Sequence, residues 1–163
     1  MDRDDKEDKP GVIIFPPLIG LADLALGLLL DYLAPLGFVT GLPFSLRVVF
    51  GGSLLALGGA MAARARGTFV AAGTNVNPMQ PALAMVTTGI FSHVRNPMYQ
   101  GATLLLIGLA LILGSDWMLI LLVPALLLLH FGVVLREERY LRIKFGQAYE
   151  DYLRNVPRYG WTF

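Results

Sequence analysis

The sequence contains no cysteine and only two histidines. Without cysteine the chain has no disulfide bond, no thiolate metal ligand and no cysteine nucleophile. The two histidines, His93 and His130, are too few and too far apart in the sequence to predict a metal site. Phosphate-binding loops, dinucleotide-binding glycine motifs and the HExxH zinc pattern are also missing. We therefore expect no bound metal and none of the common nucleotide-binding folds of soluble proteins.

Charged residues are scarce as well, since they make up 15% of the chain while apolar residues make up 55%. Soluble proteins average about 25% and about 45–50%, and a small soluble fold needs polar residues to cover its surface. The net charge is +1, and no basic stripe with interleaved aromatic residues appears, which argues against a nucleic-acid partner. We predict an integral membrane protein that forms one domain, residues 1–163, with the lipid bilayer around it.

Four apolar stretches approach the roughly 20 residues that a helix needs to cross a bilayer. The last two are separated only by Gly114, Ser115 and Asp116, a helix stop followed by N-cap residues. These two should form a tight antiparallel hairpin over 98–135. The predicted fold class is all-α, a polytopic membrane protein with about four transmembrane helices, at roughly Val12–Leu33, Leu46–Ala63, Met98–Leu113 and Trp117–Leu135.

Two kinds of residue stand out inside the first two spans. The second span is rich in glycine, at positions 51, 52, 58 and 59, and small residues let a neighbouring helix approach closely, so we interpret them as packing residues. Asp23 lies in the middle of the first span, where a carboxylate usually faces protein or a watery cavity. The sequence leaves open whether Asp23 makes a polar packing contact or belongs to a functional site.

Basic residues predict the orientation of the spans, because they favour the cytoplasmic side. They gather before the first span, between the second and third, and after the fourth, whereas Arg47 falls on the opposite side. Both termini and the central loop should therefore lie in the cytoplasm. The residues on that side are Arg3, Lys6, Lys9, Arg64, Arg66, Arg95, Arg136, Arg139, Arg142, Lys144, Arg154 and Arg158.

The remaining segments have a different character. A polar tail, 1–11, precedes the segment with the first two spans, 12–66. In residues 67–97, glycine, proline and asparagine interrupt the apolar sequence, which predicts a loop that lies in the membrane interface. In the cytoplasmic tail, 136–163, residues 136–155 carry apolar side chains on one helical face. We expect an interfacial helix that lies on the membrane or folds back over the ends of the spans.

The densest group of polar residues flanks the hairpin, with one set before its first helix and one after its second. Because a hairpin brings both sets to the same bilayer face, we expect them to be adjacent. Arginine and free helix amides suit a carboxylate, and glutamate suits an ammonium or ribose hydroxyls, so the set fits a zwitterionic ligand. Spacing alone leaves open a solvated ion-pair network instead. The Asn96-Pro97 pair is also typical of a helix start. The group comprises His93, Arg95, Asn96, Tyr99, Arg136, Glu137 and Glu138.

Residues 87–101, TTGIFSHVRNPMYQG, are similar to the pattern G-x-Y-x-x-x-R-H-P-x-Y-x-G, and residues 137–160, EERYLRIKFGQAYEDYLRNVPRYG, to E-E-x-x-L-x-x-x-F-G-x-x-Y-x-x-Y-x-x-x-V-P. Residues 74–78 match a T-x-V-x-P spacing found in bacterial members of the same group. In these features, which cover about half of the chain, the sequence resembles the isoprenylcysteine carboxyl methyltransferase and phospholipid methyltransferase superfamily.

The resemblance implies a membrane methyltransferase that binds S-adenosylmethionine on the cytosolic side, among the last two spans and the C-terminal segment. The methyl acceptor would be a lipid or an amphipathic molecule that enters from the bilayer, and the membrane would be the cytoplasmic membrane of a prokaryote. By position in the motifs, the catalytic candidates are Arg95 and Glu138. The cofactor-binding candidates are His93, Arg95, Asn96, Pro97, Tyr99, Gly101, Glu137 and Glu138.

The sequence departs from the first motif at Asn96, where histidine is usual, and at Phe91, where tyrosine is frequent. Asparagine does not titrate near neutral pH, so a proton-acceptor role is weakened at this position, and His93 could supply an imidazole instead. Two other functions stay open: an NADPH-dependent membrane reductase related to the sterol reductases, and a non-catalytic membrane scaffold, since a fold does not fix the chemistry.

Overall fold

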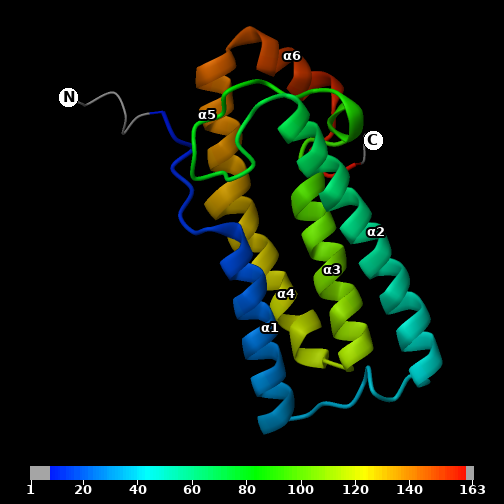
Figure 1. Ribbon diagram of the computed structural model, residues 1–163. Coiled ribbons are helices and arrows are strands. Elements are labelled where there is room, and N and C mark those ends of the chain that lie inside the picture. The colour runs from blue at the N-terminus through cyan, green and yellow to red at the C-terminus, as the bar shows by residue number, and fades with distance from the viewer. Residues whose placement is uncertain (1–7, 161–163) are drawn as a thin grey trace.

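The computed structural model describes residues 8–160, and within that range it contains helices and loops but no strand. The predicted all-α class is therefore confirmed. Two basic residues used for the orientation, Arg3 and Lys6, lie outside the described residues, as does most of the predicted polar tail. The helices, shown in chain order in Figure 1, are α1 (Pro16–Leu33), α2 (Phe44–Ala71), α3 (Pro97–Leu113), α4 (Asp116–Leu129), α5 (Leu135–Phe145) and α6 (Gln147–Asn155).

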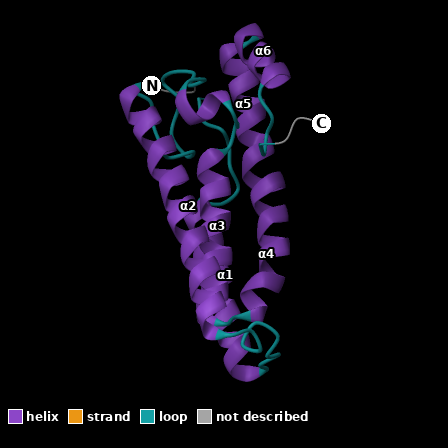
Figure 2. Cartoon of the chain, turned by 90° about the vertical axis from the view of Figure 1, so that its right-hand side faces the viewer, coloured by secondary structure: helices purple, strands orange, loops and turns teal. Residues whose placement is uncertain are grey.

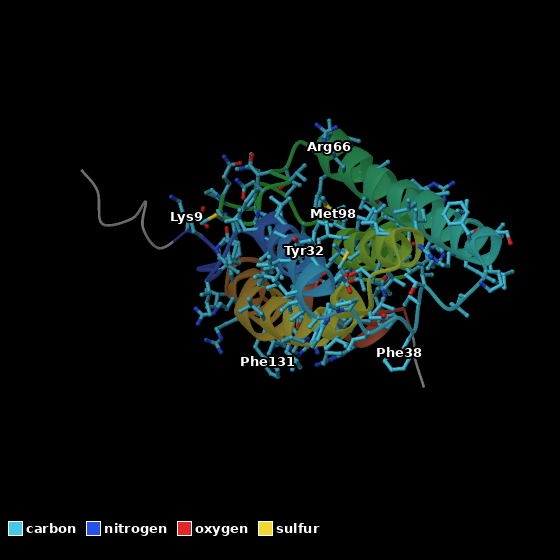
Figure 3. All side chains as sticks on the ribbon, turned by 90° about the horizontal axis from the view of Figure 1, so that it is seen from below. Lys9, Tyr32, Phe38, Arg66, Met98 and Phe131 are labelled. Atoms are coloured by element: carbon cyan, nitrogen blue, oxygen red, sulfur yellow. The ribbon has the colours of Figure 1, made fainter. Side chains whose placement is uncertain are left out.

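Within residues 8–160, three helical segments are long and apolar enough to cross a membrane, namely α1, α2 and the continuous helix Asp116–Phe145. Apolar α3 has 17 residues, which extend over about 26 Å of a hydrocarbon core roughly 30 Å thick. Large apolar side chains point away from the bundle, among them Phe131 and Phe38, which are 60% and 77% exposed (Figure 3). Such a surface requires lipid around it, so the protein is a polytopic membrane protein.

Several predicted boundaries differ from the structure, and α1 begins at Pro16 and not at Val12. α2 runs on to Ala71, past its predicted end, because the Arg-Ala-Arg sequence at 64–66 favours helix. The helix predicted over 136–155 is divided at Gly146, whose φ of +56° is rarely adopted by other residues. Its first part, α5, continues α4 through a π-helical turn, His130–Val134, and its second part, α6, folds over the end of the bundle (Figure 2).

A close backbone contact joins α2 to α3. A Cβ atom on Gly58 would lie 2.6 Å from the carbonyl oxygen of Gly101, and one on Gly108 would lie 2.6 Å from that of Gly51. Side chains do not fit at such distances, so glycine lets these two antiparallel helices touch along their length. The interpretation of the glycines as packing residues is confirmed for Gly51 and Gly58.

The first span, α1, packs mainly along the fourth, α4. A short turn joins α3 to α4, but the two helices diverge beyond it. The buried face of α1 carries Ile19, Asp23 and Gly27, and a Cβ atom on Gly27 would collide with Met118 of α4. Asp23 is 4% exposed, and neither of its oxygens has a hydrogen-bond partner within residues 8–160. Asp23 is thus buried in the α1 face that packs on α4.

Polar side chains close the end of the bundle opposite α6. Ser115 accepts a hydrogen bond from an amide in the first turn of α4 at 3.1 Å, which confirms the predicted cap, and donates one to Asp31 at the end of α1. Asp116 accepts hydrogen bonds from the amides of residues 38 and 39 at 3.0 and 2.8 Å. Arg47 donates to two carbonyl oxygens at the end of α3 at 3.0 and 2.8 Å. These contacts satisfy helix-end groups and join all four spans.

The glycine contact predicts the effect of one added methyl group. Gly58→Ala should lower stability by about 1–3 kcal/mol, because its Cβ atom meets a backbone carbonyl that cannot move without separating the helices. Gly59→Ala is the matched control, since nothing lies within 4 Å of its Cβ position and alanine favours helix. Thermal unfolding in detergent measures both variants. Equal unfolding temperatures for the two would contradict the close α2–α3 contact.

Candidate functional site

A cavity of about 790 Å³ is lined by residues of α1, α3 and α4 together with α5 and α6. Pockets of about 300–1,000 Å³ are usual for sites that bind small molecules. The loop between α2 and α3 supplies part of the wall through residues 74–86. The cavity exists because α3 leans on α2 and away from α4, so the side chains of α3 and α4 do not fill the space between them.

The wall of the cavity has an apolar part and a polar part. Leu24 of α1, Leu106 of α3 and Leu122 of α4 line it from the middle of their helices, at membrane depth. Apart from those of the loop, most of the polar side chains come from the start of α3, from α5 and from α6, at the end of the bundle. A ligand that is polar at one end and apolar at the other would match this division. The polar lining residues of these elements are Arg95, Asn96, Tyr99, Glu137, Glu138, Tyr140, Tyr149 and Tyr152.

Glu138 is shared by two arginines. Its side chain is 5% exposed, and its oxygens accept hydrogen bonds from Nε and Nη2 of Arg158 at 2.8 and 2.7 Å. Nη1 of Arg95 lies 3.0 Å from Oε1 of the same carboxylate. These hydrogen bonds raise the pKa of Arg158, and the three groups together carry one positive charge. The cluster ties α5, the start of α3 and the C-terminal segment together, and it can accept an anionic group.

The Nε donor of Arg95 is unused within the described residues. Its backbone amide donates to the carbonyl oxygen of Pro157 at 3.0 Å, and its side chain is 12% exposed. The Nε atom is buried and has no hydrogen-bond partner between residues 8 and 160. A buried donor without an acceptor costs about 1–3 kcal/mol, more when the group is charged. Because Arg95 lines the cavity, an acceptor atom of a ligand would satisfy this nitrogen.

Glu137 has a different environment from its neighbour Glu138. The hydroxyl of Tyr99 donates a hydrogen bond to Oε1 of Glu137 at 2.7 Å, and both side chains line the cavity. No arginine, lysine or histidine of the described residues forms an ion pair with Glu137. Its carboxylate can therefore receive a cationic group or a proton from a ligand.

The C-terminal segment returns to the start of α3. The hydroxyl of Tyr152 donates to the carbonyl oxygen of Phe91 at 2.7 Å, and Nδ2 of Asn96 donates to that of Arg158 at 3.3 Å. Asn96 stands at the N-cap of α3, which confirms the predicted helix start before Pro97, but its side chain makes this contact and caps no helix amide. Burial raises the pKa of Tyr152 to about 12 and that of Tyr149 further, so both hydroxyls stay protonated at neutral pH.

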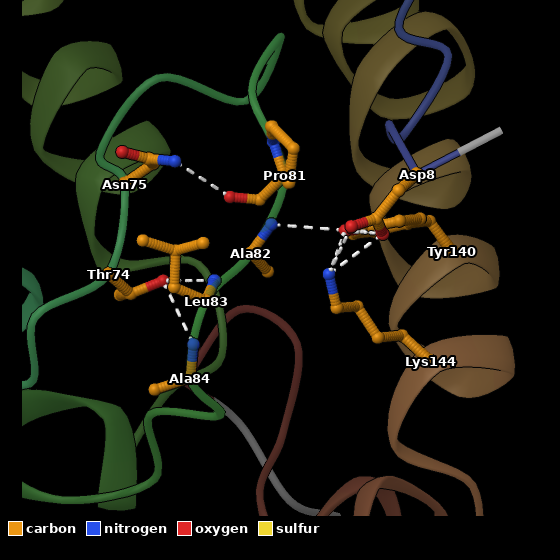
Figure 4. A network of polar contacts seen from close by, with 9 residues as sticks. All are labelled: Asp8, Thr74, Asn75, Pro81, Ala82, Leu83, Ala84, Tyr140 and Lys144. Atoms are coloured by element: carbon orange, nitrogen blue, oxygen red, sulfur yellow. Dashed lines mark hydrogen bonds and ion pairs between the residues drawn. The ribbon is translucent and has the colours of Figure 1, made fainter. Parts of the chain in front are cut away.

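The loop over the cavity is held by a hydrogen-bond network, which Figure 4 shows. Oγ1 of Thr74 accepts hydrogen bonds from the amides of residues 83 and 84 at 2.9 and 3.3 Å. The amide of Ala82 donates to the hydroxyl of Tyr140 at 3.0 Å, and that hydroxyl donates to Asp8 at 2.8 Å. The loop, α5 and the N-terminal segment are thereby joined beside the cavity.

Most of the residues predicted from the sequence come together here. Of the eight candidates, His93 and Gly101 are not among the residues that line the cavity. His93 is exposed, and its ring lies 2.9 Å from the hydroxyl of Ser92, whereas Gly101 packs on Gly58. The candidates that line the cavity are Arg95, Asn96, Pro97, Tyr99, Glu137 and Glu138.

Sequence reasoning missed three contributors to the site. Arg158 was used only to predict the orientation, and Tyr149 and Tyr152 only as an apolar helix face. The two tyrosines belong to the second motif, which could have pointed to them. Nothing in the spacing indicates that Arg158 reaches back to Glu138, because the chain reverses at Gly146 between them.

Comparisons with known proteins find similarity to membrane-associated methyltransferases by two routes, a family model and a relative. A family model described as phospholipid methyltransferase matches residues 46–148. Protein-S-isoprenylcysteine O-methyltransferase of Schizosaccharomyces pombe is 34% identical over 73 residues, which are 45% of this chain and 31% of that protein. The chain therefore covers about a third of this relative's length. No solved structure matches the chain.

The shared carboxylate predicts a large loss of stability on neutralisation. Glu138→Gln should lower the free energy of unfolding by about 3–5 kcal/mol, because two guanidinium groups then lose their buried partner. Glu150→Gln is the control: its ion pair with Arg142 is about half exposed, and its loss should change stability by at most about 1 kcal/mol. Chemical denaturation of the two variants in detergent makes the comparison. Similar losses in both would show that Glu138 is not the residue that holds this end together.

Proposed function

Because the chain belongs to the phospholipid methyltransferase family, we propose that it transfers the methyl group of S-adenosylmethionine to a lipid or amphipathic acceptor. The observation that carries the proposal is the cavity wall. There the Nε of Arg95 and the carboxylate of Glu137 border one space that continues between apolar helices, and within residues 8–160 this Nε has no hydrogen-bond partner and this carboxylate forms no ion pair. The relative's name refers to an isoprenylcysteine acceptor, and a prenyl or acyl chain is the kind of group that the apolar part would receive.

The polar residues fit the cofactor by charge. The methionine end of S-adenosylmethionine is a zwitterion and its sulfonium is a cation. Arg95 would hold the carboxylate through Nε, while Glu138 keeps the guanidinium in place through Nη1. Glu137 would face the cationic groups, and the aromatic rings of Tyr149 and Tyr152 add faces that attract a cation.

The apolar residues fit the acceptor. Leu24, Leu106 and Leu122 border the cavity at membrane depth, so an alkyl chain in this space leaves lipid for an equally apolar wall. The acceptor's reactive group would then lie near the first turn of α3. This arrangement holds the reactive groups at the boundary between the membrane and the aqueous phase and excludes water from them.

When bound, the cofactor would supply a methyl group: the acceptor atom bonds to the methyl carbon while the bond from that carbon to the sulfonium sulfur breaks in line, and the neutral thioether leaves. The residues have three tasks. Arg95 orients an anionic group through its free donor, and Glu138 positions Arg95. Glu137, with its hydroxyl partner Tyr99, takes the proton from an acceptor that must lose one before it attacks. A carboxylate acceptor has no proton to lose and would need only to be positioned in the cavity.

Neither rival function has support from the comparisons, since both matches are methyltransferases. A reductase would bind NADPH, and a scaffold would bind neither cofactor. Cofactor binding therefore separates the three functions.

Binding of S-adenosylhomocysteine, the demethylated product, tests the proposal. Isothermal titration of the detergent-solubilised protein should give saturable binding, and NADPH should give none. Glu137→Gln removes a negative charge that faces the ligand, and we expect affinity to fall by about tenfold, or about 1.4 kcal/mol. Asp151→Asn, at an exposed position of α6, is the control and should bind as the wild type does. Saturable NADPH binding without a response to S-adenosylhomocysteine would refute the assignment.

We also propose that the end of the bundle with α6 faces the cytoplasm, because it carries most of the basic residues. The chain has no cysteine, so one introduced residue can be labelled without background. In intact prokaryotic cells, an impermeant thiol reagent should label Thr40→Cys and should not label Gln147→Cys, and both positions are exposed. Labelling of both after membrane disruption is the control. The reverse pattern in intact cells would overturn the orientation.

A further inference from the structure

A second pocket lies beside the N-terminal segment. It has a volume of about 490 Å³, and residues 8–11 form one wall while one face of α5 forms the other. The α5 residues follow each other at intervals of three, one, three and one positions, which places them on the same side of the helix. The lining residues from α5 are Arg136, Arg139, Tyr140, Ile143 and Lys144.

The pocket has an excess of positive charge. Among residues 8–160, its wall holds four cationic side chains and one carboxylate, that of Asp8. Asp8 is bound by Lys144, whose Nζ lies 2.7 and 2.8 Å from its two oxygens, as Figure 4 shows. The hydrogen bond from Lys144 lowers the pKa of Asp8, so this pair stays intact at neutral pH. Three cationic side chains, Lys9, Arg136 and Arg139, are left without a carboxylate among the described residues.

These three residues can reach a ligand. Arg136 donates Nη1 to the carbonyl oxygen of Gly11 at 3.1 Å, which fixes its guanidinium at the wall and leaves its other donors available. Lys9 and Arg139 make no side-chain hydrogen bond to any residue from 8 to 160. An anion with several oxygens suits such a group, because arginine forms paired hydrogen bonds with phosphate.

The position along the helix places the pocket at the surface of the membrane. α5 continues α4, whose apolar side chains face outward, and Phe131 at the junction is 60% exposed. Ile143, on the wall of the pocket itself, is 81% exposed. An exposed isoleucine beside arginines is typical of the boundary between acyl chains and headgroups.

We propose that this pocket binds the headgroup of an anionic membrane phospholipid. Arg136 and Arg139 hold the phosphate, Lys9 approaches it from the N-terminal segment, and Ile143 contacts an acyl chain. Anionic lipids gather at the cytoplasmic leaflet, and each basic residue near that surface adds to the attraction. The site adjoins the proposed methyl-transfer site, since Pro10 and Tyr140 border both spaces, but none of the four residues that hold the lipid lines the larger cavity. Binding here is structural and involves no reaction.

Native mass spectrometry of the protein with defined lipids tests the proposal. With equal amounts of phosphatidylglycerol and phosphatidylcholine, the wild type should retain the anionic lipid in clear preference. Arg139→Gln and Arg136→Gln should each reduce that preference by about fivefold. Arg142→Gln is the matched control, because it lies on the same helix and pairs with Glu150 outside the pocket. Circular dichroism verifies that each variant is folded.

Three results would overturn the proposal. The first is equal retention of the two lipids by the wild type. The second is an equal loss in Arg142→Gln, which would indicate general attraction of basic protein to an anionic surface. The third is displacement of the lipid by soluble glycerol 3-phosphate at the same concentration, which would make the pocket a site for free phosphate. Because lipid binding is measured without turnover, the outcome does not depend on the methyltransferase assignment.

Discussion

The contact between the backbones of α2 and α3 determines where this protein has space. Lipid gives packed helices no hydrophobic gain, so association depends on close approach, which glycine at 58 and 101 allows. Because α3 lies against α2, it diverges from its neighbour in sequence, α4, and α4 finds its partner in α1. The cavity lies between these two helix pairs. Packing on one side of α3 thus creates the room for a ligand on its other side.

The adjacent residues Glu137 and Glu138 have different partners and therefore different roles. Glu138 is fully occupied by Arg95 and Arg158, whereas Glu137 has one tyrosine hydroxyl as its partner and faces the cavity. Sharing Glu138 between two guanidiniums leaves a net positive charge, and Nε of Arg95 has no acceptor in the described part of the chain. The polar end of the cavity therefore presents one cationic and one anionic group a short way apart, in a place that lipid and protein shield from water.

Local signals predicted much of this structure. The apolar stretches and the cap at Ser115 depend on residues that are close in the sequence, so they could be predicted. The predicted relationship to the methyltransferase superfamily is confirmed by the family model and the relative. The motif residues at 95–99 and 137–138 could be expected to meet, because a hairpin joins them. Pairings that depend on a reversal of the chain could not be foreseen. Arg158 reaches Glu138 only because the helix breaks at Gly146, and helical periodicity favoured an unbroken helix there.

The pairing of α1 with α4 has a consequence for biosynthesis. The first span emerges from the ribosome long before the fourth, so for most of translation α1 lacks the surface that covers it. During that interval the carboxyl group of Asp23 faces lipid or the insertion machinery, where a charged form is unfavourable. Arrival of α4 buries it and completes the bundle. A chain that stops before Met118 would keep an acidic residue exposed inside the membrane, which distinguishes unfinished molecules from finished ones.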